Sequence, residues 1–212
     1  MKVRLPAHFY VLAAIVVVGA ALTRSAATPA AQDPQGLSGA QANGGITTLY
    51  MMDPLAQSFC FANGQPGLVF QENEVRNHCS DVDVHYYSGS LTLGVEGARI
   101  ATVVDLGSPA ELEKRYGFQD TGGYGQGFAS LRVVDGKVVV LKDRDTHTEQ
   151  DLKESKALFQ DGKPLAAAPI QQGHIYLARI TERNRKDFAR IVKFMVIAYA
   201  PEQSVTIRWQ LL

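Results

Sequence analysis

Residues 174–181 read HIYLARIT, residues 188–199 read FARIVKFMVIAY, and residues 204–212 read SVTIRWQLL. In the last run Val205, Ile207 and Trp209 alternate with polar residues, which is the period of a half-buried β-strand. The first run alternates in the same way. The middle run is apolar on both faces around Lys193, so we expect it to be the most buried of the three. Because the connections between the runs are short, the sequence predicts a C-terminal antiparallel meander with Trp209 in its core.

The same region contains a pattern of more widely spaced residues, which is Gly173-His174-x-Tyr176-x-x-Arg179, then Lys193, then Ser204-Val205-Thr206-Ile207-x-Trp209. This pattern resembles a C-terminal β unit found in uncharacterised secreted bacterial proteins. The resemblance covers about 40 of the 212 residues and implies a β-strand fold and an exported chain. It implies no activity and no catalytic residue. We expect His174, at the start of its strand, to be a packed or edge residue.

Shorter β-patterns precede the meander. We expect strands over 81–86, 90–94, 98–106, 128–134 and 137–142. The last two flank Asp135-Gly136, which is a strong signal for a β-hairpin turn. Together with two short helices, these strands predict an α+β fold that is mainly antiparallel β-sheet.

The two helices are predicted from their capping residues. Ser108 as the cap, a proline after it and Glu111 three positions on form a capping box, and this helix ends by Gly117. Thr148 is the predicted cap of a second helix over 149–160. The apolar stretch 51–61 is also compatible with a short helix after its Asp-Pro pair.

The N-terminus has the layout of a secretory signal peptide. Lys2 and Arg4 precede a continuous apolar run over Phe9–Leu22, and small residues follow. We therefore assign 1–31 to a signal peptide, 32–45 to a flexible linker and 46–212 to a single β-rich domain. The alternative is an uncleaved membrane anchor, for which the run is short.

Charge excludes one class of partner. The whole chain has a formal net charge of zero, and loss of residues 1–31 removes three basic residues and no acidic one, which leaves −3. A mildly acidic domain without a basic run does not bind nucleic acid by the usual electrostatic route. Contact with a membrane is expected only through the N-terminal segment, if that segment is retained.

The two cysteines, Cys60 and Cys79, both lie in the exported part of the chain. A lone pair in an oxidising compartment is typical of a disulfide. The bond would stabilise the fold by about 3 kcal/mol on the loop-entropy estimate. The alternative is a thiolate at Cys79 activated by His78, but neighbours in a strand point to opposite sides.

A possible metal site combines His78, Asp81, Asp83 and His85. In a strand the last three would share one face, and two histidines with carboxylates suit zinc or non-haem iron. The alternative interpretation is the polar, solvent-facing side of a half-buried strand. The spacing does not decide between the two.

Two polar loops are candidate recognition elements, over 117–127 and 143–149. The first contains Tyr124, Gly125 and Gln126 in a glycine-rich stretch, which lacks the lysine and the following helix of a phosphate-binding loop. A ligand-covering loop and a plain connection both remain open.

These observations favour an exported, periplasmic or cell-surface, binding or structural module without catalytic machinery. The expected partner is an envelope protein or a small ligand, and no cofactor is expected. One alternative is a metal-dependent hydrolase that uses zinc at residues 78–85. Another is an accessory subunit of a cell-envelope complex, whose sign would be an exposed apolar patch.

Overall fold

The computed structural model describes residues 43–67, 70–71, 74–75, 79–84, 89–94, 99–117, 128–143, 148–159 and 166–212. These residues form an α+β fold dominated by antiparallel β-sheet, with two short helices in the described part of the chain. This confirms the fold class expected from the sequence. Residues 1–42, which include the predicted signal peptide and most of the predicted linker, lie outside the described residues.

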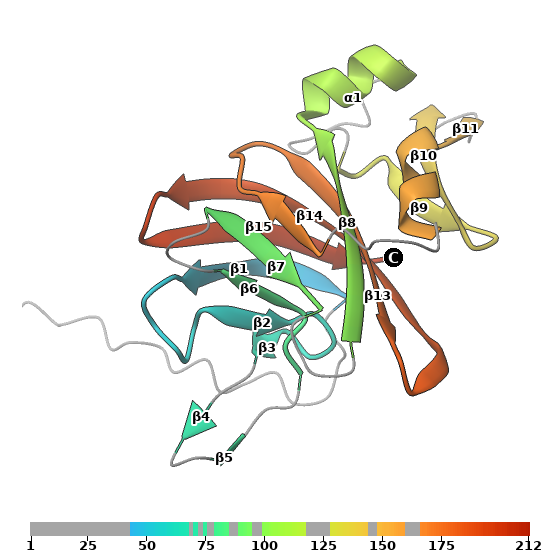
Figure 1. The fold of residues 1–212 in the computed structure, drawn as a ribbon. Coiled ribbons are helices and arrows are strands. Elements are labelled where there is room, and N and C mark those ends of the chain that lie inside the picture. The colour runs from blue at the N-terminus through green and yellow to red at the C-terminus, as the bar shows by residue number, and fades with distance from the viewer. Residues whose placement is uncertain are drawn as a thin grey trace, which may run out of the picture. The chain divides into compact units, whose positions relative to one another are not determined.

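A five-stranded antiparallel sheet forms the centre of the domain (Figure 1). Its order is β1 (Gly44–Tyr50), β15 (Ser204–Leu211), β14 (Arg185–Ala200), β13 (Ile175–Glu182) and β8 (Arg99–Gly107). The three C-terminal strands follow one another as the predicted meander. β1 adds to β15 in continuous register from Gly44 to Tyr50, so the strand begins inside the predicted linker.

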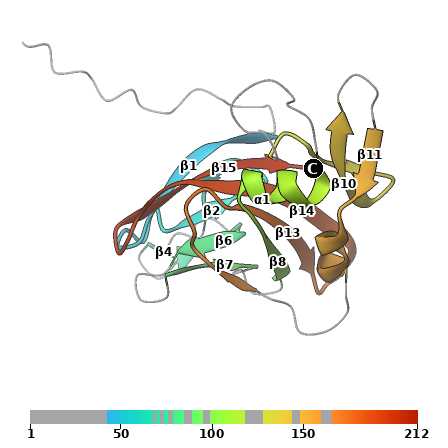
Figure 2. The ribbon, with the colours of Figure 1, turned by 90° about the horizontal axis from the view of Figure 1, so that it is seen from above.

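A second five-stranded sheet packs against one face of the first (Figure 2). Its order is β12 (Ala167–Pro169), β7 (Ser90–Leu93), β6 (Val82–Val84), β2 (Ser58–Cys60) and β3 (Gln65–Pro66). A separate pair is formed by β4 (Phe70–Gln71) and β5 (Glu74–Val75). The strands β9 (Leu131–Val134), β10 (Lys137–Asp143) and β11 (Thr148–Asp151) form a third sheet.

The central sheet is covered on both faces. Tyr176, Ala178 and Ile180 of β13 pack into the core shared with the second sheet, together with Trp209 and its neighbours on β15. Ile175 and Leu177 pack into a second core with α1, β9 and β10. This alternation is the one that the sequence predicted, and Trp209 is in the core as expected.

The middle strand of the meander is not the most buried, so that expectation is wrong. Residues Ile175–Ala178 of β13 are all buried, whereas β14 is exposed over Arg185–Asp187. β14 has 16 residues and β13 has eight. The longer strand extends past the layers that cover the sheet.

Two local predictions are confirmed. Helix α1 (Pro109–Tyr116) starts with a complete capping box between Ser108 and Glu111 and ends at Gly117, which is left-handed. Strands β9 and β10 form the predicted hairpin, and Asp135 and Gly136 both have positive φ angles of 49° and 73°. This is the conformation that a two-residue hairpin turn needs.

The helix predicted over 149–160 is wrong. Thr148–Asp151 pairs with β10 as strand β11, and the backbone N–H of Leu152 donates to the carbonyl of Val138. Only the short 3₁₀ helix η1 (Lys153–Phe159) follows. Pairing with a buried neighbouring strand satisfies the backbone groups that a helical cap at Thr148 would have satisfied.

The helix considered within 51–61 is also absent from the structure. The side chain of Asp53 accepts from the backbone of Leu55, which forms a tight polar turn. The chain then enters β2, which pairs with β6 and β3.

Candidate functional site

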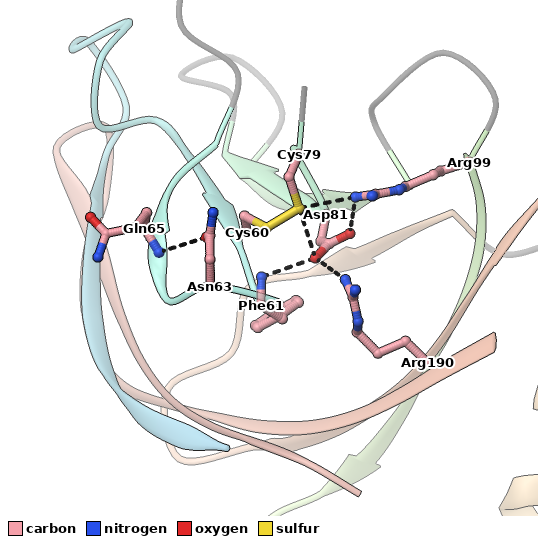
Figure 3. The surroundings of a disulfide bond; sticks show 8 residues. All are labelled: Cys60, Phe61, Asn63, Gln65, Cys79, Asp81, Arg99 and Arg190. Atoms are coloured by element: carbon pink, nitrogen blue, oxygen red, sulfur yellow. Dashed lines mark hydrogen bonds and ion pairs between the residues drawn. A yellow bond between two sulfur atoms is a disulfide. The ribbon is translucent and has the colours of Figure 1, made fainter. Parts of the chain in front are cut away.

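Cys60 and Cys79 form the predicted disulfide, with their Cα atoms 5.3 Å apart (Figure 3). The bond links the end of β2 to the segment that enters β6. A disulfide indicates an oxidising, extracytoplasmic environment. No helix in the described part of the chain is long and apolar enough to cross a bilayer.

Asp81 lies beside this disulfide and is completely buried. Its carboxylate accepts from Nη1 of Arg99 at 2.6 Å and from Nη1 of Arg190 at 2.7 Å. It also accepts from the backbone N–H of Phe61 at 2.9 Å. The two guanidinium groups come from β8 and β14 of the central sheet (Figure 3). Asp81 therefore ties the disulfide segment to the large sheet.

The structure changes how the predicted metal residues are interpreted. Asp81 and Asp83 are buried, at 0 % and 5 % exposure, so the alternative of a solvent-facing polar side is wrong for these two. His78 and His85 lie outside the described residues. In the described ranges one group of potential ligands lies at metal-binding distances, and it consists of Cys60, Cys79 and Asp81, of which the cysteines are bonded to each other.

The structure describes only the ends of the two candidate recognition loops. Tyr124, Gly125 and Gln126 lie outside the described residues, as do 144–147. Phe128 is the first described residue after the glycine-rich stretch, and it is buried.

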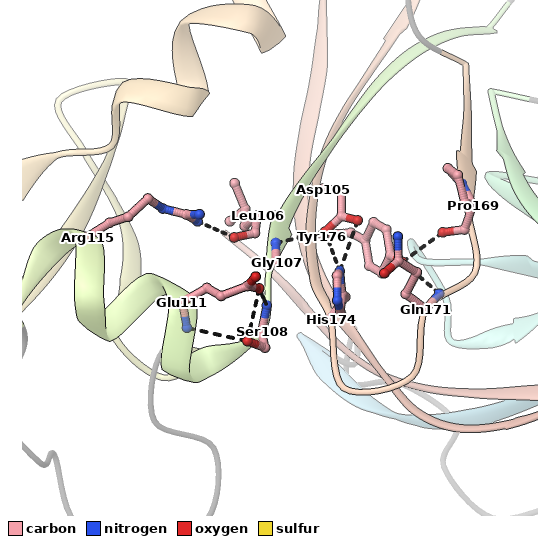
Figure 4. Close-up of polar contacts among 10 residues, drawn as sticks. All are labelled: Asp105, Leu106, Gly107, Ser108, Glu111, Arg115, Pro169, Gln171, His174 and Tyr176. Carbon is pink, nitrogen blue, oxygen red and sulfur yellow. Dashed lines mark hydrogen bonds and ion pairs between the residues drawn. The ribbon is translucent and has the colours of Figure 1, made fainter.

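His174 and Asp105 form a pair that the sequence did not indicate (Figure 4). Nδ1 of His174 lies 3.0 Å from both carboxylate oxygens of Asp105, and the N–H of Gly107 also donates to Asp105. Both side chains are partly exposed, at 22 % and 27 %. Such a pair fixes the orientation of the imidazole. His174 directly precedes β13 and Asp105 lies in the neighbouring strand β8, 69 positions earlier in the sequence.

The groups around this pair are structural. The backbone and hydroxyl of Ser108 hydrogen-bond to Glu111 and lower the pKa of its carboxyl group. The hydroxyl of Tyr176 donates to the carbonyl of Pro169 at 2.8 Å, and burial raises its pKa to about 12 (Figure 4). Glu111 thus caps helix α1, and Tyr176 holds the end of β12.

Lys193 is a buried cation on the opposite face of β14 from the main core. It is 2 % exposed, and its Nζ donates to the carbonyls of Phe128 at 2.6 Å and Leu131 at 2.8 Å. Burial, together with the positive charges of Arg208 and Arg132, lowers the pKa of Lys193 to about 8. The charged neighbours that act on this lysine are therefore cations.

The ring of Phe128 contacts two cations. Nζ of Lys193 and the guanidinium carbon of Arg208 are each 4.7 Å from the ring centroid. The two charges are thus at most about 9.4 Å apart, which is comparable to the Debye length of about 10 Å at 0.1 M salt.

A cavity of about 430 Å³ lies beside this arrangement, and we call it the Arg208 pocket. Its lining consists of Asn43, Gly44, Gly45, Ile46, Phe128, Arg208, Trp209 and Gln210. The two glycines at the start of β1 have no side chains to fill the hollow. The lining therefore combines an aromatic ring and a guanidinium group, and the buried Lys193 contacts that same ring without lining the pocket.

Sequence reasoning found only part of this site. It singled out Lys193 as a break in an apolar run, which is the one signal of a special role. Arg208 occupied an ordinary polar position in an alternating strand. Phe128 is 65 residues before Lys193, and no local pattern connects the two.

A second cavity, of about 410 Å³, lies between β10 and η1 and includes Leu152 and Phe159 in its lining. Lys137, Asp151 and Lys156 stand at its edges. Its lining carries charges of both signs, whereas the one charged residue that lines the Arg208 pocket is a cation, and we place the candidate functional site at the Arg208 pocket.

Comparisons of the chain with models of known protein families, with curated proteins and with solved structures find no match. The resemblance of residues 173–212 to a β unit of secreted bacterial proteins stays a prediction.

Proposed function

We propose that this protein is an exported, non-catalytic binding module that holds an oxyanion of its ligand in the Arg208 pocket. The observation that carries the proposal is the placement of Lys193 and Arg208 on one aromatic ring beside a cavity. The disulfide supports a role outside the cytoplasm.

The charge of the site selects an anionic ligand. Lys193 has a pKa of about 8, so it is mostly protonated at neutral pH. Its ammonium group bonds to two carbonyls and lies near two other cations. An anion in the neighbouring cavity would offset this accumulation of positive charge. Arg208 adds a planar fork of donors that matches carboxylate, phosphate or sulfate groups.

The size of the cavity fits a small ligand or one group of a larger one. A volume of about 430 Å³ falls in the range of small-molecule sites. Phe128 offers an apolar surface for the body of the ligand. The chemistry we assign is therefore an oxyanion attached to a partly apolar group.

A fluorescence titration tests this function. Trp209 is the only tryptophan of the chain and lines the pocket, so its emission reports on binding. The full chain, purified from a host that exports it, would be titrated with inorganic phosphate, sulfate and glutarate. We expect saturable binding of at least one probe, and the strongest probe identifies the oxyanion.

Matched variants make the test specific. Arg208→Gln should weaken binding at least tenfold, whereas Arg208→Lys should retain part of it. Arg183→Gln is the control, because it removes the same charge from the exposed β13–β14 turn. Absence of saturable binding, or equal binding by Arg208→Gln and the parent, would overturn the proposal.

No observation on the described residues favours the metal-dependent hydrolase. The carboxylate of Asp81 is held by Arg99, Arg190 and a backbone amide, so using it as a zinc ligand would break two ion pairs. The hydrolase stays a hypothesis that rests on the sequence spacing alone.

A further inference from the structure

Exposed apolar side chains gather at the start of the domain. Five large hydrophobic side chains are exposed among the described residues, and four of them lie on β1 or directly after it. These are Ile46 at 66 %, Tyr50 at 51 %, Met52 at 72 % and Leu55 at 54 % exposure. A cluster of this kind marks an interaction surface more often than scattered single residues do.

The hydrogen bonds of β1 show which backbone groups face away from the sheet. The N–H of Leu211 donates to the carbonyl of Asn43, and the N–H of Met51 donates to the carbonyl of Gln203. In an antiparallel ladder, residues whose N–H and C=O groups bond to the neighbouring strand alternate with residues whose N–H and C=O groups point away from it. The N–H and C=O groups of Gly44, Ile46 and Thr48 therefore point to the side of β1 that has no neighbouring strand in the described sheets.

This edge lacks the features that keep strand edges from pairing. The sequence of β1 is GGITTLY, with no charge and no proline, and its register with β15 has no bulge. The edges of the other sheets differ, because β3 contains Pro66, β12 contains Pro169, and β11 contains Glu149 and Asp151. Charged residues and prolines are the usual means of blocking edge-to-edge association.

We propose that β1 pairs antiparallel with β1 of a second copy of this chain, so that two central sheets join across a two-fold axis. The three outward residues are self-complementary. With Ile46 facing the partner's Ile46, Gly44 faces the partner's Thr48 and Thr48 faces the partner's Gly44. All outward N–H and C=O groups of Gly44, Ile46 and Thr48 then find partners, as an isologous interface requires.

The same register brings the partner subunit to the Arg208 pocket. Ile46, Thr48 and Tyr50 share one face of β1, and Ile46 stands opposite Arg208 in the ladder, on the pocket side. The partner's Tyr50 lies two positions beyond the residue that faces Gly44. Its side chain is therefore within the diagonal reach of cross-strand neighbours and covers the glycine end of the pocket.

Oligomeric state is the test. The full chain, purified from a host that exports it, would be analysed by light scattering after size exclusion over a wide concentration range. We expect a dimer. Ile46→Lys should halve the mass, because it opposes two charges at the axis. Phe159→Lys is the control, since it removes an exposed apolar side chain elsewhere and should leave the dimer intact.

A cross-link tests the register. Facing residues of a hydrogen-bonded antiparallel pair have Cα atoms about 5.5 Å apart, which is compatible with a disulfide. Ile46→Cys should therefore form a covalent dimer on a non-reducing gel, and Phe159→Cys should not. A monomeric parent protein, a dimer that survives Ile46→Lys, or a failure of Ile46→Cys to cross-link would overturn the proposal.

Discussion

Arg190, in the middle of β14, bonds to Asp81 at 2.7 Å although the two residues are 109 positions apart in the chain. Arg99 completes the contact from β8. One buried carboxylate thus connects the disulfide segment to two strands of the central sheet.

Removal of this charge should be strongly destabilising. Asp81→Asn leaves two guanidinium groups without their carboxylate in a buried site, and we expect a loss of about 3–5 kcal/mol in the free energy of unfolding. Denaturant titration measures it. Asp105→Asn, in the partly exposed pair with His174, should cost about 1 kcal/mol or less. Equal losses in the two variants would contradict the role of Asp81.

The disulfide should stabilise the fold by restricting the conformations of the unfolded chain. Cys60→Ala combined with Cys79→Ala removes the constraint on a loop with a sequence separation of 19, and we expect a loss of about 3 kcal/mol on the loop-entropy estimate. The same denaturant titration, with and without reductant, checks this. Reductant should lower the stability of the parent to that of the double variant and leave the variant unchanged.

Lys193 should make stability rise with pH above neutrality. Its pKa is about 8 in the folded protein and about 10.4 in an unfolded chain, so between these values the unfolded state binds the extra proton. The free energy of unfolding should therefore increase from pH 8 to about 10, by up to about 3 kcal/mol. Chemical denaturation at a series of pH values measures the slope. Lys193→Met should show no such rise, whatever its absolute stability.

Two tyrosines should reverse this trend at higher pH. Burial raises the pKa of Tyr116 and of Tyr176 to about 12, while an unfolded tyrosine titrates near 10. The folded state holds these protons more tightly, so stability should fall from about pH 10 to 12. Tyr176→Phe should reduce the fall relative to the parent. A parent protein whose stability is flat above pH 10 would contradict the assignment.

The affinity for the ligand should also depend on the protonation of Lys193. If an oxyanion occupies the Arg208 pocket, its affinity should decrease as the pH rises through about 8, because Lys193 loses its charge. The Trp209 titration repeated at several pH values measures this. Lys193→Met should bind more weakly and lose the pH dependence, and a dependence that persists in this variant would assign the effect to another group.

Much of the fold could be predicted from local patterns. The alternation of Val205, Ile207 and Trp209, the capping box at Ser108 and the Asp135-Gly136 turn each depend on a few neighbouring residues, and each is confirmed. Thr148 shows the limit of such patterns. Its capping signal is local, but the edge of β10 is supplied by the tertiary fold, and strand pairing prevails.

The candidate site could not be predicted in the same way. Phe128, Lys193 and Arg208 meet only because β14 and β15 are adjacent and the chain before β9 crosses their outer face. A solvent-facing Asp83 was one of two interpretations of its alternating strand, yet both faces of that strand are covered. Of the three site residues, the sequence indicated only Lys193, which is a charged residue within an apolar run.

Strand β13 has a consequence for how the domain opens. Successive residues Tyr176 and Leu177 belong to two different cores, so both cores pack against the same strand. Unfolding of either core exposes side chains of this strand to water, and the domain should therefore unfold in a single cooperative step. The amide protons of Ile175 to Ala178 should then be among the last to exchange with deuterium.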